Sequence, residues 1–408
     1  MGILRFIQNS KSNASMVQFD FSGKIEIMIK KNSETLNTVT IRPLNRNIKP
    51  AIHDNTIYFQ IDSPTKLSIE CNGDRLHNLH VFANACEEEA YTENDPNVIY
   101  FGAGLHKPEK GTDFIIPSNK IVYIAPGAVL KGRLLCNKVT NVKILGRGIV
   151  MSPAQGISIT FSTSISISGI TFINPIHYTV YGGQSSKIDI NNIKSFSCEK
   201  WSDGIDVMSC SDMTIKDVFL RNSDDCIAVY GHRGAFYGDV HNIAVKNSIL
   251  WADKAHPINI GVHGEDDKEK NIIENLTFHN IDILEQKESL VAAQGCMAIT
   301  CGDNNLIRNV LFEKIRVDDF TLGQLFNLRV TLSKVYNKKP GYGIENVTFR
   351  NITYNGKNRN PSQLGGYDEN RILKKVRFKN ITINGKKIKS LKEMNVQINS
   401  FVKDIKIK

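Results

Sequence analysis

The sequence lacks a long apolar run. Although 41% of its 408 residues are hydrophobic, no stretch of about 18 apolar residues occurs, so we expect no transmembrane helix and no membrane partner. The opening MGILRFIQNSKSNAS holds a short apolar patch and no small-residue cleavage site, which predicts no secretory signal. We therefore expect a cytoplasmic protein. The alternative is a secreted protein whose signal has been removed.

Metal and cofactor motifs are also missing. The eight cysteines form no CxxC pair and have no histidines at ligand spacing, so we expect free thiols, no metal site and no cofactor. A disulfide between Cys296 and Cys301 remains an open alternative. GAGLHKPEKG contains GxG but no third glycine at the spacing of the motif and no following helix, which excludes a dinucleotide site.

Clustered positive charge is absent, although the net charge is +10. The lysines and arginines are scattered, as on a solvated outer face, and no basic stripe with interleaved aromatics occurs. We therefore expect no nucleic-acid partner, while an acidic polymer remains an open alternative. The sequence leaves the oligomeric state unknown.

Helical periodicity is missing, and strand patterns are abundant. Residues 1–95 alternate apolar and polar side chains in short runs such as TIYFQI and KLSIECNG, with turn residues between the runs. This pattern predicts a small antiparallel β-sandwich domain. The acidic segment NACEEEAYTENDPN, residues 84–97, is interpreted as the linker.

Residues 96–408 are predicted to form a second domain built from repeats. One unit recurs: an apolar residue, any residue, Asn, Asp or Gly, then apolar, any, apolar. It appears as ISGITF (167–172), INNIKS (190–195), IKDVFL (215–220), IENLTF (273–278), IRNVLF (307–312) and IENVTF (344–349), with looser copies from Ile144, Val245 and Leu373. A shortest step of 23 residues, β-branched side chains and a turn Asn indicate a right-handed parallel β-helix. The whole chain is therefore expected to be all-β.

Stacked coils would bring distant acids together. Aligning the inward pairs Ile205/Val207, Ile227/Val229 and Ile258/Ile260 places Asp203, Asp225 and His256 in one outer column, with Asp224 beside it. Asp206 and Asn259 form a second column. A lone corner Asp usually caps a turn, but grouped carboxylates repel, and the pKa of one should rise. Paired carboxylates with divergent pKa values are the machinery of glycoside hydrolysis.

These motifs resemble glycoside hydrolase families 28 and 49, the polygalacturonase and dextranase clan of parallel β-helix enzymes. WSDG matches the Asn-Thr-Asp-Gly motif of the polygalacturonases, SDDC matches Gly-Asp-Asp, and AHPINIG is similar to Gly-His-Gly with Ala and Pro replacing the glycines. The Arg-Ile-Lys motif, which grips a uronate carboxylate in that family, is replaced in GCMAITCGD (295–303). Family 49 enzymes cleave neutral glucans and carry an N-terminal sandwich, which residues 1–95 resemble, notably in IECNGDRLHNLHVFAN (69–84).

The resemblance implies an inverting hydrolase of a poly- or oligosaccharide, family 49-like and acting on a neutral glycan, with a polygalacturonase-like pectin hydrolase as the alternative. It implies that Asp224 is the general acid and that Asp203 and Asp225 hold and activate a water. His256 would tune Asp224 or bind sugar hydroxyls.

Further candidates for substrate binding each have a structural alternative. Asp206 would anchor a sugar hydroxyl or the turn, and Trp201 and Tyr230 would stack on sugar or pack in the core. The remaining candidates lie in loops or later coils: His232, His263, Asp303 and Arg329.

Two other functions fit a β-helix. A polysaccharide lyase needs a basic residue beside a uronate, often with calcium, and the predicted column holds no such residue. A non-catalytic glycan-binding module would bind without turnover and would have no use for three grouped carboxylates.

Overall fold

The computed structural model of the protein describes residues 2–8, 10–89, 91–264, 270–333 and 335–408. The chain divides into two compact units, Met1–Tyr91 and Thr92–Lys408. Both are built from strands, and the described helical pieces are short: η1 (Leu44–Arg46), η2 (Val291–Ala293) and α1 (Leu391–Met394). Among the described residues, no helix has the length and apolar character needed to cross a membrane.

The N-terminal unit is a small sandwich of two sheets. Side chains from both sheets, such as Phe59 and Ile69, share one apolar core. All pairings are antiparallel except that β2 and β8 run parallel, which departs from the predicted purely antiparallel pattern. The five-stranded sheet contains β1 (Gly2–Gln8), β2 (Ser10–Phe21), β8 (Leu79–Ala85), β7 (Thr65–Cys71) and β4 (Val39–Arg42), and the three-stranded sheet contains β3 (Ile25–Lys30), β6 (Thr56–Ile61) and β5 (Ala51–His53).

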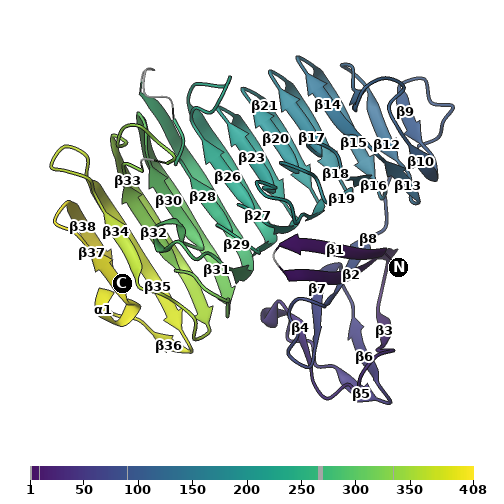
Figure 1. The fold of residues 1–408 in the computed structure, drawn as a ribbon, viewed down its shortest axis with the longest axis horizontal. Coiled ribbons are helices and arrows are strands. Elements are labelled where there is room, and N and C mark those ends of the chain that lie inside the picture. Colours follow the sequence, from purple (N-terminus) through teal and green to yellow (C-terminus); the bar gives the residue numbers. More distant parts are fainter. Residues whose placement is uncertain (1, 9, 90, 265–269, 334) are drawn as a thin grey trace. The chain divides into compact units, whose positions relative to one another are not determined.

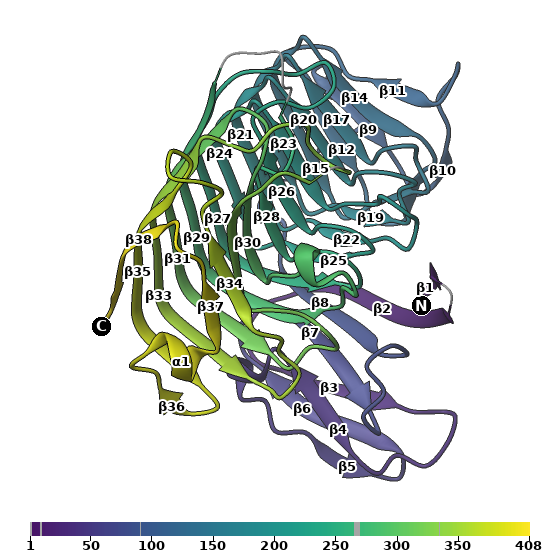
Figure 2. The ribbon, with the colours of Figure 1, turned by 60° about the vertical axis from the view of Figure 1, so that its left-hand side comes forward.

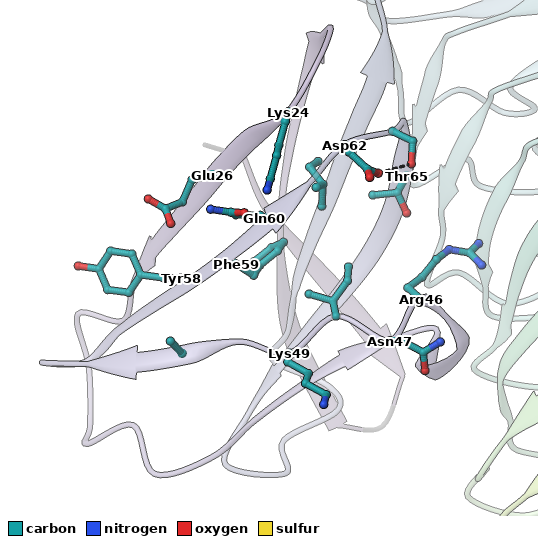
Figure 3. Close-up of a pocket in the computed structure, with 14 residues that line it drawn as sticks. Lys24, Glu26, Arg46, Asn47, Lys49, Tyr58, Phe59, Gln60, Asp62 and Thr65 are labelled. Carbon is teal, nitrogen blue, oxygen red and sulfur yellow. Dashed lines mark hydrogen bonds between the residues drawn. The ribbon is translucent and has the colours of Figure 1, made fainter.

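An open hollow of about 610 Å³ lies over the three-stranded sheet of this unit (Figure 3). Its lining mixes charges of both signs, among them Lys24, Glu26, Lys49 and Asp62. No pair of neighbouring acids with opposed pKa shifts lines it, so the hollow does not coincide with the predicted chemistry.

The second unit is a right-handed parallel β-helix (Figures 1 and 2). One face is an eleven-stranded sheet of β11 (Asp113–Ile115), β14 (Arg133–Asn137), β17 (Ile157–Thr160), β20 (Val180–Gly183), β23 (Ile205–Met208), β26 (Ile227–Tyr230), β28 (Ile258–Ile260), β30 (Met297–Cys301), β32 (Phe326–Val330), β34 (Ser362–Gly365) and β37 (Val396–Ile398).

The other faces belong to a nineteen-stranded sheet that bends around the coil. It contains β9 (Val98–Phe101), β10 (Gly104–His106), β12 (Ile121–Ile124), β13 (Ala128–Leu130), β15 (Thr140–Gly146), β16 (Ile149–Met151), β18 (Thr163–Ser168), β19 (Thr171–Ile173), β21 (Ser186–Asn191), β22 (Lys194–Phe196), β24 (Ser211–Lys216), β25 (Phe219–Asn222), β27 (Val240–Ala252), β29 (Asn271–Gln286), β31 (Asn305–Asp318), β33 (Gly343–Asn355), β35 (Leu373–Ile383), β36 (Lys386–Lys387) and β38 (Val402–Ile407).

Asparagines at the coil corners stack on one another. Asn346 donates to Asn309 at 2.8 Å, Asn309 to Asn275 at 3.3 Å, and Asn275 to Asn242 at 3.4 Å. All four have φ between 54° and 61°, the left-handed conformation that Asn tolerates best among residues with a side chain. The corner therefore selects Asn because one side chain both accepts the turn and bonds to the next coil.

The predicted repeat register is wrong at one step. In the structure Val245 pairs with Phe278, and Ile273 pairs with Val240. Each coil has two corners with a left-handed residue between inward apolar side chains, such as Asp212 and Asp217. The sequence repeats up to residue 220 contain the second corner of their coils, whereas the repeats from Ile273 onward contain the first corner. Both corners need the same residue types, so the pattern alone did not distinguish them.

Apolar side chains fill the interior of the coils in continuous stacks. The rings of Phe278, Phe312, Phe349 and Phe378 lie 5.0–5.1 Å apart from one neighbour to the next and nearly parallel. Six of the eight cysteines are buried, and all eight are free. This close packing makes each coil a fixed support for the residues at its corners.

Candidate active site

The strand register confirms the alignment predicted for the acids. Ile205 pairs with Ile227 and then Ile258, and Val207 pairs with Val229 and then Ile260. Asp203, Asp225 and His256 each stand two residues before the first member of these rows. The amide of Gly204 donates to the Asp225 carbonyl at 2.8 Å, and that of Cys226 to the His256 carbonyl at 2.9 Å, so the column continues into the corner.

Three carboxylates meet at this corner, which we call the carboxylate corner: Asp203, Asp224 and Asp225. One oxygen atom from each lies within 4.8 Å of the other two. Asp224 and Asp225 precede β26 in a bend, where the Asp225 amide donates to Oδ1 of Asp224 at 3.0 Å. The bend lets two consecutive side chains approach the same point. Such oxygens are also close enough to hold a metal ion, but nothing else in the described residues indicates one.

His256 and Asn259 hold the carboxylate of Asp225. Nδ1 of His256 lies 2.7 Å from its Oδ1, the His256 amide donates to the same oxygen at 2.9 Å, and Nδ2 of Asn259 donates to Oδ2 at 2.6 Å. Burial raises the pKa of Asp225, but the charge and hydrogen bonds of His256 and the Asn259 amide outweigh it, so the pKa is lowered. Asp225 is therefore the ionised acid of the group.

The pKa values of the other two carboxyls, Asp203 and Asp224, are raised. Burial, and next the charge of Asp225, raise the pKa of Asp224 to about 7. Burial, and then Asp206 and the other carboxylates, raise the pKa of Asp203 well above its ordinary value. Asp224 is partly exposed, whereas Asp203 is only 7% exposed. The corner thus contains one anion and two groups that keep protons, as like charges at this spacing require.

His256 contacts Asp225 directly, and its charge also lowers the pKa of Asp224, the residue that it was predicted to tune. The pKa of His256 is lowered by burial but raised more by Asp225, giving a net rise. Nε2 of the ring is buried without a protein hydrogen-bond partner. A protonated ring would leave this N–H free for a substrate oxygen.

Asp206 lies in the second predicted column. It pairs with Tyr181 on one side and with Ala228, followed by Asn259, on the other. Its side chain is 1% exposed, and its Oδ1 has no hydrogen-bond partner. Burial and then the charge of Asp225 raise its pKa well above the ordinary value. Asp206 therefore adds a fourth acid, with a retained proton, behind the carboxylate corner.

The predicted aromatic residues occupy different settings. Trp201 is 57% exposed, with Nζ of Lys200 4.3 Å from its ring centre, so it is no core residue. Tyr230 is buried, and its hydroxyl donates to Oδ2 of Asp225 at 3.5 Å. The ring of His263 meets Tyr230 edge-on at 5.0 Å, and burial, followed by the charge of Arg233, lowers the pKa of His263 to about 4.

Three of the predicted substrate-binding residues form hydrogen bonds with loop or strand atoms away from the carboxylate corner. Asp303 accepts the amides of Lys338 and Lys339 at 2.7 Å and so anchors that loop. Nε of Arg329 donates to Asn327 at 2.8 Å, and Nη2 donates to the carbonyl of Ala292. Nε2 of His232 lies 3.3 Å from the carbonyl of Gly234 in its own turn. Arg329 stands on β32, three strands beyond β26, which is about 14 Å along the sheet.

Sequence reasoning selected His232 from the loop GHR (231–233) but not its neighbour Arg233, a basic residue whose charge acts on the acids of the site. Its guanidinium carbon lies 5.4 Å from the centre of the Tyr230 ring, and its charge acts on Asp203 and Asp206. Its charge also acts on Tyr178 and Tyr181, whose rings stack on each other with their centres 5.2 Å apart. The only signal was that Arg233 opens an inserted loop directly after β26.

A parallel β-helix with acids of opposed pKa at one corner is the arrangement predicted from the sequence for glycoside hydrolysis. The chain belongs to glycosyl hydrolases family 28, whose family model matches residues 131–401. It is 26% identical over 204 residues to "Probable endopolygalacturonase D" of Neosartorya fischeri, a match that covers 49% of this chain and 38% of that protein. A 24% match over 184 residues to "Probable endopolygalacturonase C" of Aspergillus aculeatus covers 45% and 39%.

Solved structures share the fold. Dex49A from Penicillium minioluteum has a TM-score of 0.67 at 15% identity, covering 97% of this chain and 84% of that one. The family 28 exopolygalacturonase of Yersinia enterocolitica has a TM-score of 0.52 at 13% identity, with 94% and 96% coverage. These likenesses confirm the predicted fold class, and the family model confirms the predicted resemblance to family 28.

Proposed function

We propose that the carboxylate corner cleaves a glycosidic bond of a poly- or oligosaccharide by direct displacement with water. The observation that carries this proposal is the approach of three carboxylate oxygens to within 4.8 Å, with the pKa of Asp224 raised to about 7 and that of Asp225 lowered. A proton donor and an ionised base side by side are the two groups that the reaction needs.

Asp224 protonates the glycosidic oxygen as the bond to the leaving sugar breaks. It is the more exposed of the three acids, and its raised pKa keeps the proton available near neutral pH. Asp225 accepts a proton from the attacking water, because His256 and Asn259 keep it ionised.

Asp203 holds the water rather than deprotonating it. A water hydrogen-bonded to two oxygens at ~2.8 Å each spans about 4.5–5 Å between them, which fits the spacing of the corner. The raised pKa of Asp203 leaves it a proton with which to bond that water. Attack of this water from the face opposite the leaving group inverts the anomeric carbon.

Inversion belongs to the proposal and has its own test. Carboxyl groups of inverting enzymes are about 6.5–9.5 Å apart and those of retaining enzymes about 5–5.5 Å. The 4.8 Å limit is measured between single oxygen atoms and not between the centres of the carboxyl groups, so it does not distinguish inversion from retention. NMR of the first product formed identifies the new anomer, and a retained configuration would contradict the displacement by water.

The substrate has two candidates. The missing Arg-Ile-Lys motif favours a neutral glycan, since β30 presents Ala298 and Thr300 where the basic pair would stand. The curated relatives, named as polygalacturonases, favour a galacturonan. We would assay dextran, isomaltotriose, polygalacturonate and trigalacturonate for new reducing ends with wild type, Asp224→Asn and the surface control Asp189→Asn.

Release by wild type and Asp189→Asn, with a fall of about 10²–10⁴-fold in Asp224→Asn, is the expected result. Full activity of Asp224→Asn would refute its role as the acid. Binding of a glycan with no turnover would indicate a binding module instead.

A further inference from the structure

The turn that follows β26 carries a fixed cation. The backbone of Arg233 pairs with that of Phe236 through hydrogen bonds of 3.0 and 3.2 Å. Phe236 is 4% exposed and packs with Tyr178, Met208 and Tyr230. A Cβ at Gly183 would lie 2.4 Å from the Phe236 ring, so this glycine makes the room that Phe236 fills. The packed ring anchors the turn and with it the position of Arg233.

The guanidinium of Arg233 lies among the acids and rings of the site. It is 5.4 Å from the centre of the Tyr230 ring, and its charge lowers the pKa of both Asp203 and Asp206 against the larger effect of burial. In the described part of the chain no carboxylate forms an ion pair with it within 4.0 Å. The acids on which its charge acts, Asp203 and Asp206, are both acids whose pKa values burial raises well above the ordinary value.

The surface beside Arg233 suits a sugar ring. Tyr178 and Tyr181 stack at 5.2 Å with an angle of 11° between their planes, and Tyr181 is only partly buried. Tyr181 pairs in register with Asp206 of the next strand, and Asp206 lies one strand before β26, the strand that Asp224 and Asp225 precede. Aromatic faces pack against the apolar face of a sugar, while a guanidinium fork binds a carboxylate through two hydrogen bonds.

We propose that Arg233 binds the carboxylate of an acidic sugar residue that lies against Tyr181, next to the bond cleaved at the carboxylate corner. The inference rests on the proposed function, and it favours a uronate-containing glycan over the neutral one. The later coils do not supply this cation, since Arg329 is bonded to Asn327 and Ala292, and β30 offers Ala298 and Thr300. Lys254 is a second cation of the site, where its charge lowers the pKa of Asp224, but Arg233 is the one whose charge acts on Tyr178 and Tyr181.

A simpler role for Arg233 is to balance the charge of Asp203 and Asp206. The two roles differ in one measurable respect. Charge balance serves the cleavage of every substrate alike, whereas a subsite for a carboxylate discriminates a uronate from its methyl ester. The ester has the same ring and linkage without the charge.

The experiment measures kcat/KM for trigalacturonate and for its methyl ester with wild type, Arg233→Gln, Arg233→Lys and the control Lys246→Gln. Lys246 is exposed on β27 of the other sheet. We expect Arg233→Gln to lose about 10- to 100-fold of the preference for the acid, mostly through KM, as for a lost hydrogen bond to a charged group. Arg233→Lys should keep part of the preference, and Lys246→Gln all of it.

An acid-to-ester ratio in Arg233→Gln within about twofold of wild type would overturn the inference while leaving the hydrolase intact. A binding measurement separates the two proposals. Calorimetry with trigalacturonate compares Asp224→Asn with Asp224→Asn/Arg233→Gln. If wild type cleaves no glycan but this binding depends on Arg233, the hydrolase proposal fails and the subsite stands. If binding is the same in both variants, the subsite is refuted.

Discussion

Nδ1 of His256 lies 2.7 Å from Oδ1 of Asp225, and the backbone amide of the same histidine donates to that oxygen at 2.9 Å. Two donors from one residue thus converge on one carboxylate oxygen, 31 residues away in sequence. The pair is buried, with Asp225 4% and His256 7% exposed. A buried imidazolium and carboxylate stabilise each other's charged forms, so the ring keeps Asp225 ready to accept a proton.

Replacing this histidine should move the acidic limb of the activity profile. His256→Gln removes the positive charge that outweighs burial, so the pKa of Asp225 rises. Because the base must be ionised, loss of activity on acidification then begins at a higher pH. The charged neighbours Asp224, Lys254 and Glu288 remain in the variant.

The measurement is kcat/KM against pH for wild type, His256→Gln and His279→Gln, a surface histidine paired with Glu313. An acidic limb that stays in place in His256→Gln would show that the ring has only a structural role.

The wild-type enzyme should lose activity as the pH rises through about 7. Asp224 must carry a proton to act as the acid, and its pKa is raised to about 7 by burial and the charge of Asp225. On the acidic side activity should persist below pH 3.8, the ordinary pKa of an aspartate, because the pKa of Asp225 is lowered. A profile of kcat/KM reports these groups in the free enzyme. A basic limb below pH 5 would contradict the assignment of Asp224.

The buried acid behind the corner should destabilise the fold at neutral pH. The folded-state pKa of Asp206 is raised, so between the ordinary pKa of 3.8 and the raised value the native state binds more protons than the unfolded chain. Stability contributed by this group is therefore full below pH 3.8 and falls as the pH rises. Asp206→Asn removes the cost of taking up this proton on folding and should raise the free energy of unfolding by about 1–3 kcal/mol at pH 7.

Urea unfolding at pH 4 and pH 7 measures this difference, with Asp189→Asn, a partly exposed residue paired with Lys216, as the control. Equal stabilisation by Asp206→Asn at both pH values would show that ionisation is not the cause.

The phenylalanine stack should dominate the stability of the later coils. Phe312 is fully buried between Phe278 and Phe349, each at 5.0 Å. Phe312→Ala leaves a cavity and should lower the free energy of unfolding by about 3–5 kcal/mol. Denaturant unfolding followed by circular dichroism checks this, with Leu105→Ala as the exposed control. A loss below about 1 kcal/mol would mean that the stack does not pack as described.

The sequence predicted the β-helix because inward β-branched residues and left-handed Asn corners repeat with the coil. The apolar pairs that begin at Ile205, Ile227 and Ile258 were aligned correctly, since each pair follows its polar corner residue at the same spacing of two. The register between Val245 and Ile273 was wrong, because both corners of a coil accept the same residues. Local chemistry specifies that a corner exists, not which corner it is.

For the site, too, the sequence determined some features and the tertiary structure determined others. The sequence by itself determined that Asp203, Asp225 and His256 share a column, since period-two strands stacked in register put equivalent positions side by side. Only the tertiary structure decided which acids keep a proton, because burial and the partners His256 and Asn259 depend on side chains from other coils. It alone also placed Arg233 at the site, since an inserted turn has no repeat register and its direction is set by the packing of Phe236.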